Sequence, residues 1–177
     1  MNIAGRPHIQ SYIAQNICDP WKETPFSGYR SMDNKQKGAL GEMLVREHFI
    51  DLGHEVKTAE TSTSGYDLII DGIRTEVKFS LAHTDIKNNK TKTDCFTMNH
   101  VAVGKNWERL IFLGVNQQSD PRFVFTTKEL FVKALNKGEY FSRQQGGKHG
   151  NNDDYMIAGA KLKKLIESEY MKGISEW

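Results

Sequence analysis

The stretch from Gly65 to Ser80, GYDLIIDGIRTEVKFS, constrains the fold more than any other part of the chain. A short apolar run follows Asp67, and the residues from Arg74 to Phe79 alternate between charged side chains and Thr, Val or Phe. The pair Asp71-Gly72 between these runs is typical of a two-residue turn. The stretch therefore predicts a β-hairpin made of two short strands.

The charged residues of this hairpin have a spacing that suits a metal-dependent phosphodiesterase. Residues i and i+2 of a strand share a face, so Glu76 and Lys78 are expected to point the same way, with Asp67 beside them on the partner strand. Two carboxylates can share Mg²⁺, which prefers oxygen ligands, and the backbone carbonyl of Val77 can add another. An ammonium next to this metal can position the attacking water or neutralise charge in the transition state.

This arrangement resembles the PD-(D/E)XK nuclease superfamily. The resemblance rests on Asp67, on the Glu76-Val77-Lys78 motif and on an acid in an upstream helix, Glu42, while Tyr66 stands where the family usually has proline. It implies an α/β fold with a restriction-endonuclease-like core, in which helices flank a mixed central sheet. It also implies Mg²⁺-dependent DNA cleavage, with Mn²⁺ expected to substitute. Taken alone, an E-x-K pattern more often marks a solvated strand face.

Residues 34–53 have apolar residues at helical spacing and predict a helix. Gly38 and Gly41 lie within this helix, where glycine lowers helix propensity, so the close approach of another backbone or of a phosphate is expected there. In the superfamily that this chain resembles, the acid of this helix ligates the metal or orients its water. Glu42 is the candidate, and Glu47 is the alternative.

The remaining segments predict a conventional set of core elements. Residues 54–60 are expected to form a strand before the hairpin. The apolar runs at 109–115 and 122–125 predict two paired strands, followed by a helix that is capped by Thr126 or Thr127 and ends at Gly138. Residues 155–171 predict a final helix with a basic outer face.

Two polar segments are candidates for contact with DNA. Residues 81–100 are expected to form a loop rich in Lys, Asn and Thr, which often contact the DNA backbone. Residues 139–154 are expected to form a long loop whose amide and basic side chains can read base edges. A solvated or flexible loop is the alternative for both. The candidate DNA-binding residues are Lys37, Lys87, Lys90, Lys92, Arg143, Gln144, Gln145, Lys148, Asn151 and Asn152.

The 177 residues are expected to form a single nuclease domain. Its core spans about 35–135, with an N-terminal arm at 1–34 and a C-terminal loop and helix at 139–177. The formal net charge of +2 is compatible with a nuclease, because an acidic metal site offsets basic residues elsewhere. The two cysteines lack zinc-ligand spacing. The chain has neither a long apolar run nor a visible signal peptide, so it is expected to be cytoplasmic.

The favoured function is a sequence-specific DNA endonuclease of the restriction or homing type, acting on double-stranded DNA. A homodimer is expected, because each chain has one site and a duplex has two strands. A Holliday-junction resolvase is the second enzyme candidate, since Lys37-Gly38, Glu42 and the segment SGYDLII look like the opening motifs of that family. A nucleic-acid-binding protein that kept the fold and lost the chemistry is the alternative from another class.

Overall fold

The computed structural model describes residues 7, 19–61, 63–87, 90–144 and 153–177, and it divides into two compact units, Met1–Asp33 and Asn34–Trp177. In the first unit, a short 3-10 helix, η1 (Tyr29–Ser31), follows a turn in which Asp19 accepts hydrogen bonds from the N–H groups of Trp21 and Gly28. The rings of Trp21 and Phe26 meet edge to face, with their centroids 5.8 Å apart. That the chain forms one nuclease domain stays a prediction.

The second unit is built around a six-stranded mixed sheet in the order β1-β2-β3-β7-β8-β11. Strands β3 and β7 run parallel, and every other neighbouring pair is antiparallel. The strands are β1 (Val56–Thr58), β2 (Leu68–Ile70), β3 (Ile73–Leu81), β7 (Arg109–Val115), β8 (Pro121–Thr127) and β11 (Lys172–Gly173). The predicted mixed central sheet is therefore confirmed, although the strand predicted at 54–60 is shorter.

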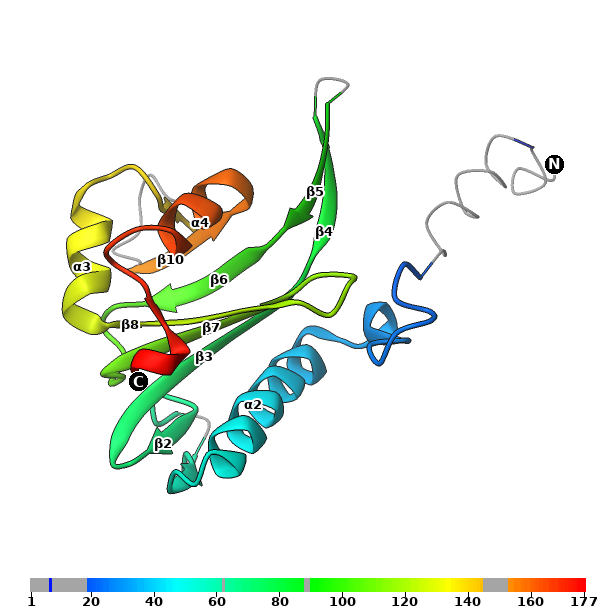
Figure 1. Ribbon diagram of the computed structural model, residues 1–177. Helices are drawn as coiled ribbons and strands as arrows, with labels where there is room; N and C mark the ends of the chain where they lie inside the picture. Colours follow the sequence, from blue (N-terminus) through cyan, green and yellow to red (C-terminus); the bar gives the residue numbers. More distant parts are fainter. Residues whose placement is uncertain (1–6, 8–18, 62, 88–89, 145–152) are drawn as a thin grey trace, which may run out of the picture. The chain divides into compact units, whose positions relative to one another are not determined.

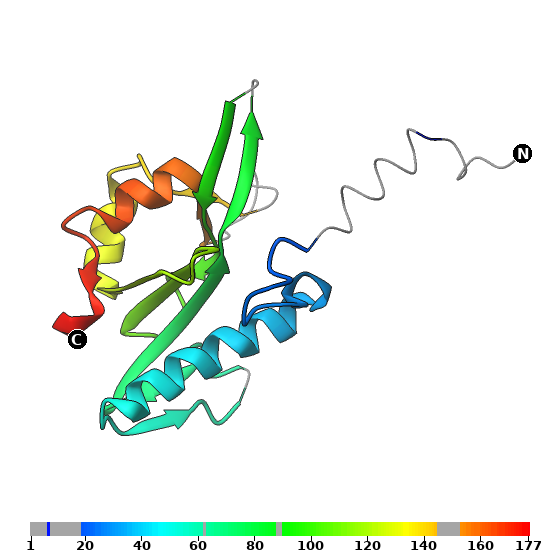
Figure 2. The same cartoon turned by 45° about the vertical axis from the view of Figure 1, so that its right-hand side comes forward.

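Helices flank this sheet on both sides, as the α/β prediction requires (Figures 1 and 2). Helix α2 (Asn34–Asp51) packs against β3, whereas α3 (Lys128–Asn136) and α4 (Gly159–Ile166) lie across the sheet from it. Helix α3 begins as predicted, because the side chain of Thr127 accepts a hydrogen bond from the N–H of Leu130. A 3-10 helix, η2 (Ile174–Glu176), ends the chain. Among the helices that the structure describes, none is long and apolar enough to cross a membrane.

The hairpin predicted from the sequence is confirmed. Ile70 pairs with Ile73, and the two turn residues Asp71 and Gly72 have φ angles of 50° and 82°. Two consecutive positive φ angles match the turn type that Asp-Gly favours between antiparallel strands. Beyond the turn, both faces of β3 are covered, because Thr75, Glu76 and Val77 are all buried in succession.

The prediction of a loop at residues 81–100 is wrong, because this segment forms three strands. They are β4 (His83–Lys87), β5 (Lys90–Cys95) and β6 (Thr97–Ala102). Strands β4 and β5 pair as an antiparallel hairpin that projects beyond the central sheet (Figures 1 and 2). Thr91 and Thr93 stand two positions apart within β5, and threonine favours strands even in a polar sequence.

The helix predicted at 155–171 is shorter in the structure, so both of its predicted ends are wrong. Residues Asp154–Ala158 form β10, which pairs with β6 on one side and with β9 (Ser142–Arg143) on the other. Tyr155 and Ile157 are two positions apart, which is the spacing of one face of a strand, and pairing on both sides fixes this segment as a strand. Gly159, with φ of 56°, follows this strand directly and is the first residue of the shorter helix α4.

Candidate functional site

Asp67 lies directly before β2 and is tied to β3 through its backbone and its side chain. Its N–H donates to the carbonyl of Thr75 over 3.0 Å, and its Oδ2 accepts from the N–H of Val77 over 2.7 Å. The N–H and the carbonyl of one strand residue face the same neighbour, so the carbonyl of Val77 also faces the Asp67 side. The predicted placement of Asp67 beside the Glu76–Lys78 motif is therefore present.

Glu76 is the most buried charged group of the site, with 2% of its side chain exposed. Its Oε1 lies 2.8 Å from Nζ of Lys78 and 3.4 Å from Nζ of Lys105. Its Oε2 is buried and has no hydrogen-bond partner among the described residues. A buried polar atom without a partner is costly and rare in native proteins, so Oε2 indicates a ligand that completes the site.

Helix α2 brings a third carboxylate towards these residues. A Cβ on Gly41 would overlap the Cβ of Phe79, so the helix approaches β3 as closely as glycine allows. The close approach expected at Gly41 is present, but the neighbour is the side chain of Phe79 and not a backbone or a phosphate, and at Gly38 the expectation is wrong because a Cβ there would meet no described atom within 4 Å. Glu42 follows Gly41 directly, and Glu47 is 59% exposed and lies 3.4 Å from Arg46. Of the two candidate acids, Glu42 is thus the one that adjoins the site.

The electrostatics of the site show that its carboxylates are crowded. Burial, followed by the negative charge of Glu76, raises the pKa of Asp67 from 3.8 to about 6, although the hydrogen bond from Val77 lowers it. Burial and Glu76 also raise the pKa of Glu42, and the ammonium of Lys78 partly offsets this. Each carboxylate therefore destabilises the charge of another, a situation that a bound cation relieves.

The residues present fit a Mg²⁺ ion. In the described part of the chain, no three His, Cys, Asp or Glu side chains form a ready-made metal cluster. Mg²⁺ does not need such a cluster, because it keeps several waters and often binds through one or two carboxylates. Asp67 and the unpartnered Oε2 of Glu76 supply oxygen ligands of this kind.

Lys105 is a site residue that the sequence did not reveal. It lies between β6 and β7, 29 residues after Glu76. Its loop reaches the site because Gly65, with φ of 78°, has no side chain, and a Cβ there would lie 2.9 Å from the backbone N of Asn106. Lys105 reaches this end of the sheet because β7 runs parallel to β3, so the residues just before β7 lie at the same end of the sheet as Thr75, and the sequence carried no signal of this pairing.

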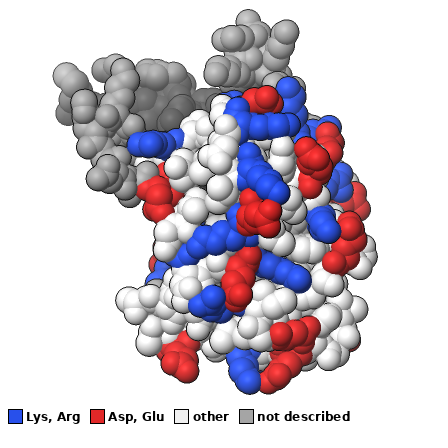
Figure 3. Space-filling model, turned by 90° about the vertical axis from the view of Figure 1, so that its left-hand side faces the viewer, with Lys and Arg blue, Asp and Glu red and all other residues white. Residues whose placement is uncertain are grey.

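The residues predicted to bind DNA are spread over several elements. Lys37 lies in the first turns of α2, and Lys87, Lys90 and Lys92 lie on the projecting β4–β5 hairpin. Arg143 ends β9, and the N–H of Gln144 donates to the carbonyl of Asp154 over 2.9 Å. Gln145, Lys148, Asn151 and Asn152 lie outside the described residues. On the face shown in Figure 3, basic and acidic side chains are interspersed.

Comparisons with known proteins include a weak likeness to a solved structure. No family model matches the chain, and no curated protein matches it. A solved structure of a bacterial homing endonuclease, I-Ssp6803I, is similar over 71% of this chain and 74% of that one, with a TM-score of 0.42 and 15% sequence identity. A likeness of this size assigns neither a family nor an activity to this chain.

Proposed function

We propose that this protein is a Mg²⁺-dependent DNA endonuclease of the PD-(D/E)XK kind. One observation carries the proposal: the buried Glu76 has one oxygen paired with Lys78 at 2.8 Å and a second oxygen without a partner in the described structure. A stabilising ion pair would need only the first oxygen. The second one, next to Asp67 and Glu42, is what a site for a hard cation requires.

The four motif residues divide the work of phosphodiester hydrolysis among them. Asp67 and Glu76 would hold the cation, with the carbonyl of Val77 as a further ligand and Glu42 acting through a water. Bound Mg²⁺ would supply electrophilic stabilisation of the phosphate and a more acidic water.

Lys78 is the candidate for the chemical step itself. Its side chain is 17% exposed, and its ammonium is held by the carboxylate of Glu76. An ammonium fixed in this way can orient the attacking water and offset the negative charge that develops on the phosphate. Because it is oriented before the substrate arrives, it needs little reorganisation during the reaction.

The substrate that this proposal favours is double-stranded DNA, cut at a defined sequence by a homodimer. Each chain provides one Asp67–Glu76–Lys78 site, and cutting both strands therefore requires two chains. The restriction or homing type is preferred to a junction resolvase because of the amide-rich segment 143–152, whose side chains suit base reading.

Incubation of the full chain with a long duplex and with an immobile four-way junction tests the proposal. Mg²⁺ or Mn²⁺ should support cutting of the duplex, and a chelator should stop it. Glu76→Gln should be inactive, whereas Glu129→Gln should remain active, because Glu129 is exposed on α3 and pairs with Lys133 of the same helix. Binding without any cleavage, in either metal and on either substrate, would favour the non-catalytic alternative and reject this function.

A further inference from the structure

Two lysines, not one, point at the buried carboxylate of Glu76. Nζ of Lys78 lies 2.8 Å from Oε1, and Nζ of Lys105 lies 3.4 Å from the same oxygen. One carboxylate oxygen that already has a close ammonium partner gains little stability from a second, longer contact near solvent. Lys105 therefore calls for an explanation other than the charge balance of Glu76.

The two lysines differ in their access to solvent. The side chain of Lys105 is 45% exposed, whereas that of Lys78 is 17% exposed. Lys105 thus reaches the site from the side that an incoming polymer can approach. Its contact with Glu76 is also the longer of the two, so the ammonium can turn towards a ligand without breaking a tight ion pair.

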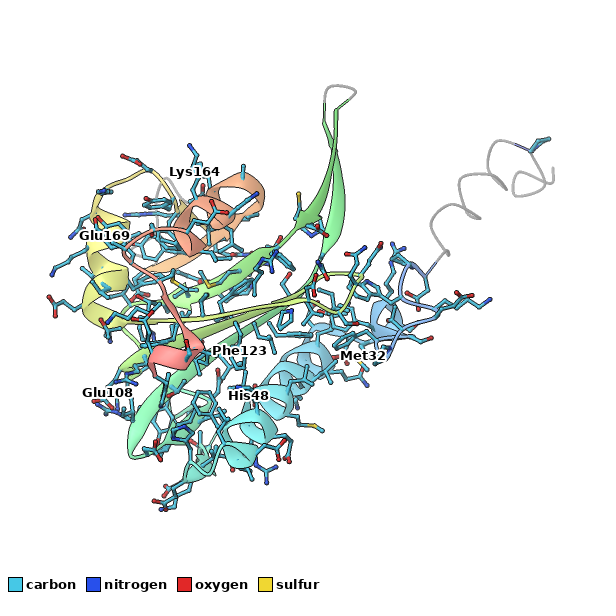
Figure 4. All side chains as sticks on the ribbon, viewed as in Figure 1. Met32, His48, Glu108, Phe123, Lys164 and Glu169 are labelled. Atoms are coloured by element: carbon cyan, nitrogen blue, oxygen red, sulfur yellow. The ribbon has the colours of Figure 1, made fainter. Side chains whose placement is uncertain are left out.

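The backbone around Lys105 is held without the help of its ammonium. Its carbonyl accepts a hydrogen bond from Nζ of Lys128 over 2.6 Å, and the side chain of Asn106 accepts one from Arg74 over 2.7 Å. Arg74 also donates to Glu108, which is labelled in Figure 4. The indole of the adjacent Trp107 is buried and donates to the carbonyl of Ala102 over 2.8 Å. These contacts fix the loop and present the Lys105 side chain to the site.

The charges of the site indicate what Lys105 would bind. Three carboxylates, those of Glu42, Asp67 and Glu76, face two ammonium groups. A divalent cation would change this one-charge negative excess into a one-charge positive excess, which matches the single negative charge of a phosphodiester. Without Lys105 the metal-loaded site would be neutral and would have no net attraction for the substrate.

From these observations we infer that Lys105 binds the phosphodiester that is cleaved at this site, through a non-bridging oxygen. The inference rests on the proposed nuclease function and adds a second cationic residue to it. Lys78 serves the attacking water, and Lys105 serves the phosphate, whose charge grows towards the transition state. Lys105 thereby acts in substrate binding as well as in turnover.

Three variants of the full chain test this inference: Lys105→Met, Lys105→Arg and, as a matched control, Lys164→Met. Lys164 is exposed on α4 and points away from the sheet in Figure 4. A fluorescent mixed-sequence duplex is the probe for binding, measured with Ca²⁺ in place of Mg²⁺ over a series of salt concentrations. Cleavage in Mg²⁺ and the free energy of unfolding are measured for the same variants.

We expect Lys105→Met to fold as stably as the wild type and to bind the duplex more weakly. The slope of log Kd against log salt should fall by about 1, because one phosphate contact is lost. Its kcat/KM should fall by about tenfold or more, and Lys105→Arg should recover part of the loss, because it keeps the charge. A residue that only balanced the charge of Glu76 would change none of the salt dependence.

Lys105→Met that binds and cuts DNA as Lys164→Met does would overturn the inference while leaving the nuclease function intact. Failure of the nuclease function alone gives a different result. If the wild type binds the duplex but never cuts it, the nuclease function is rejected, and the binding of Lys105→Met relative to Lys164→Met still decides whether Lys105 contacts phosphate. A wild type that neither binds nor cuts overturns both.

Discussion

The N–H of Val77 donates a 2.7 Å hydrogen bond to Oδ2 of Asp67, and this bond joins the two halves of the site hairpin. It fixes the Asp67 carboxylate next to β3 and leaves its other oxygen for a ligand. It also lowers the pKa of Asp67, although burial and the charge of Glu76 raise that pKa more strongly, to about 6. The carboxylate is thus held in place by a group that only partly offsets the cost of its charge.

Asp67→Asn is therefore expected to stabilise the metal-free protein at neutral pH. The folded chain holds the proton of Asp67 more tightly than the unfolded chain does, so the stability that this group provides is complete below pH about 4 and is lost as the pH rises through about 6. Asn carries no charge and escapes this loss. The advantage of the variant should reach on the order of 1–3 kcal/mol above pH about 6, measured by urea unfolding in a chelator.

Asp71→Asn is a control in which the pH dependence of folding stability has the opposite sign. A hydrogen bond from His54, followed by one from the N–H of Glu55, lowers the pKa of Asp71, so its contribution is present above its ordinary pKa of 3.8 and is lost in acid. Asn preserves the turn, because Asn-Gly is as favourable as Asp-Gly there.

Asp67→Asn should also bind Mg²⁺ more weakly than the wild type, as measured by calorimetry. Unchanged Mg²⁺ affinity, or a stability difference that does not vary with pH, would contradict the role given to Asp67.

Lys78→Met is expected to abolish cleavage while DNA affinity stays within a few-fold of wild type. The ammonium of Lys78 lies deep in the site and is held by Glu76, so it serves the transition state more than the bound substrate. Lys105→Met should instead weaken binding as well, which separates the two lysines. The measurements are single-turnover cleavage in Mg²⁺ and duplex binding in Ca²⁺. Cleavage by Lys78→Met at nearly the wild-type rate would disprove the site assignment.

Gly41→Ala is expected to destabilise the protein, whereas Gly38→Ala should stabilise it. The new Cβ at position 41 would overlap Phe79 of β3, and such overpacking typically costs about 1–3 kcal/mol. At position 38 no described atom lies within 4 Å of the new Cβ, so alanine should add about 0.5–1 kcal/mol through helix propensity. Chemical denaturation of the two variants gives both values. Equal effects of the two substitutions would mean that α2 does not pack closely on β3.

The parts of the fold that the sequence predicted are those in which local signals agree with tertiary structure. The hairpin at Asp71-Gly72 and the apolar strands β7 and β8 each carry their own pattern. The segments whose predicted structure was wrong depend on pairing with partners that are distant in the sequence. Residues 154–158 form a strand because β6 and β9 lie on either side of them, and that information lies in residues 97–102 and 142–143.

The residues of the site divide in the same way, into those that a local pattern places and those that distant pairing places. Asp67, Glu76 and Lys78 lie on one hairpin, so strand periodicity alone places them together, and the glycine next to Glu42 indicated the close approach of α2. Lys105 was missed because its loop meets the site only through the parallel pairing of β3 with β7 and the contact at Gly65. Parallel pairing joins segments that have no sequence pattern in common, so one sequence does not reveal it.

The last prediction concerns the choice of DNA sequence and rests on the segment between β9 and β10. The ends of this segment are held together, since Arg143 pairs with Tyr155 and the N–H of Gln144 donates to the carbonyl of Asp154. Deleting residues 145–150 leaves three residues to join Gln144 to Asp154, a connection length that a hairpin accepts. The deletion should therefore leave the site hairpin and its metal binding unchanged.

Sequence choice, in contrast, should be lost in this deletion variant. The segment 143–152 contains two glutamines, two asparagines, an arginine and a lysine, whose donors and acceptors suit the edges of bases, whereas recognition of a four-way junction relies on phosphates and shape. Wild-type protein digesting a random-sequence linear library should yield cut ends enriched in one sequence, and the deletion variant should yield cut ends without it. Parallel digestion of an immobile junction supplies the comparison. Efficient junction cleavage by the wild type, with no sequence enriched at linear cut ends, would reject sequence-specific cleavage and favour the resolvase alternative, in which the same Asp67–Glu76–Lys78 site acts on a substrate selected by shape.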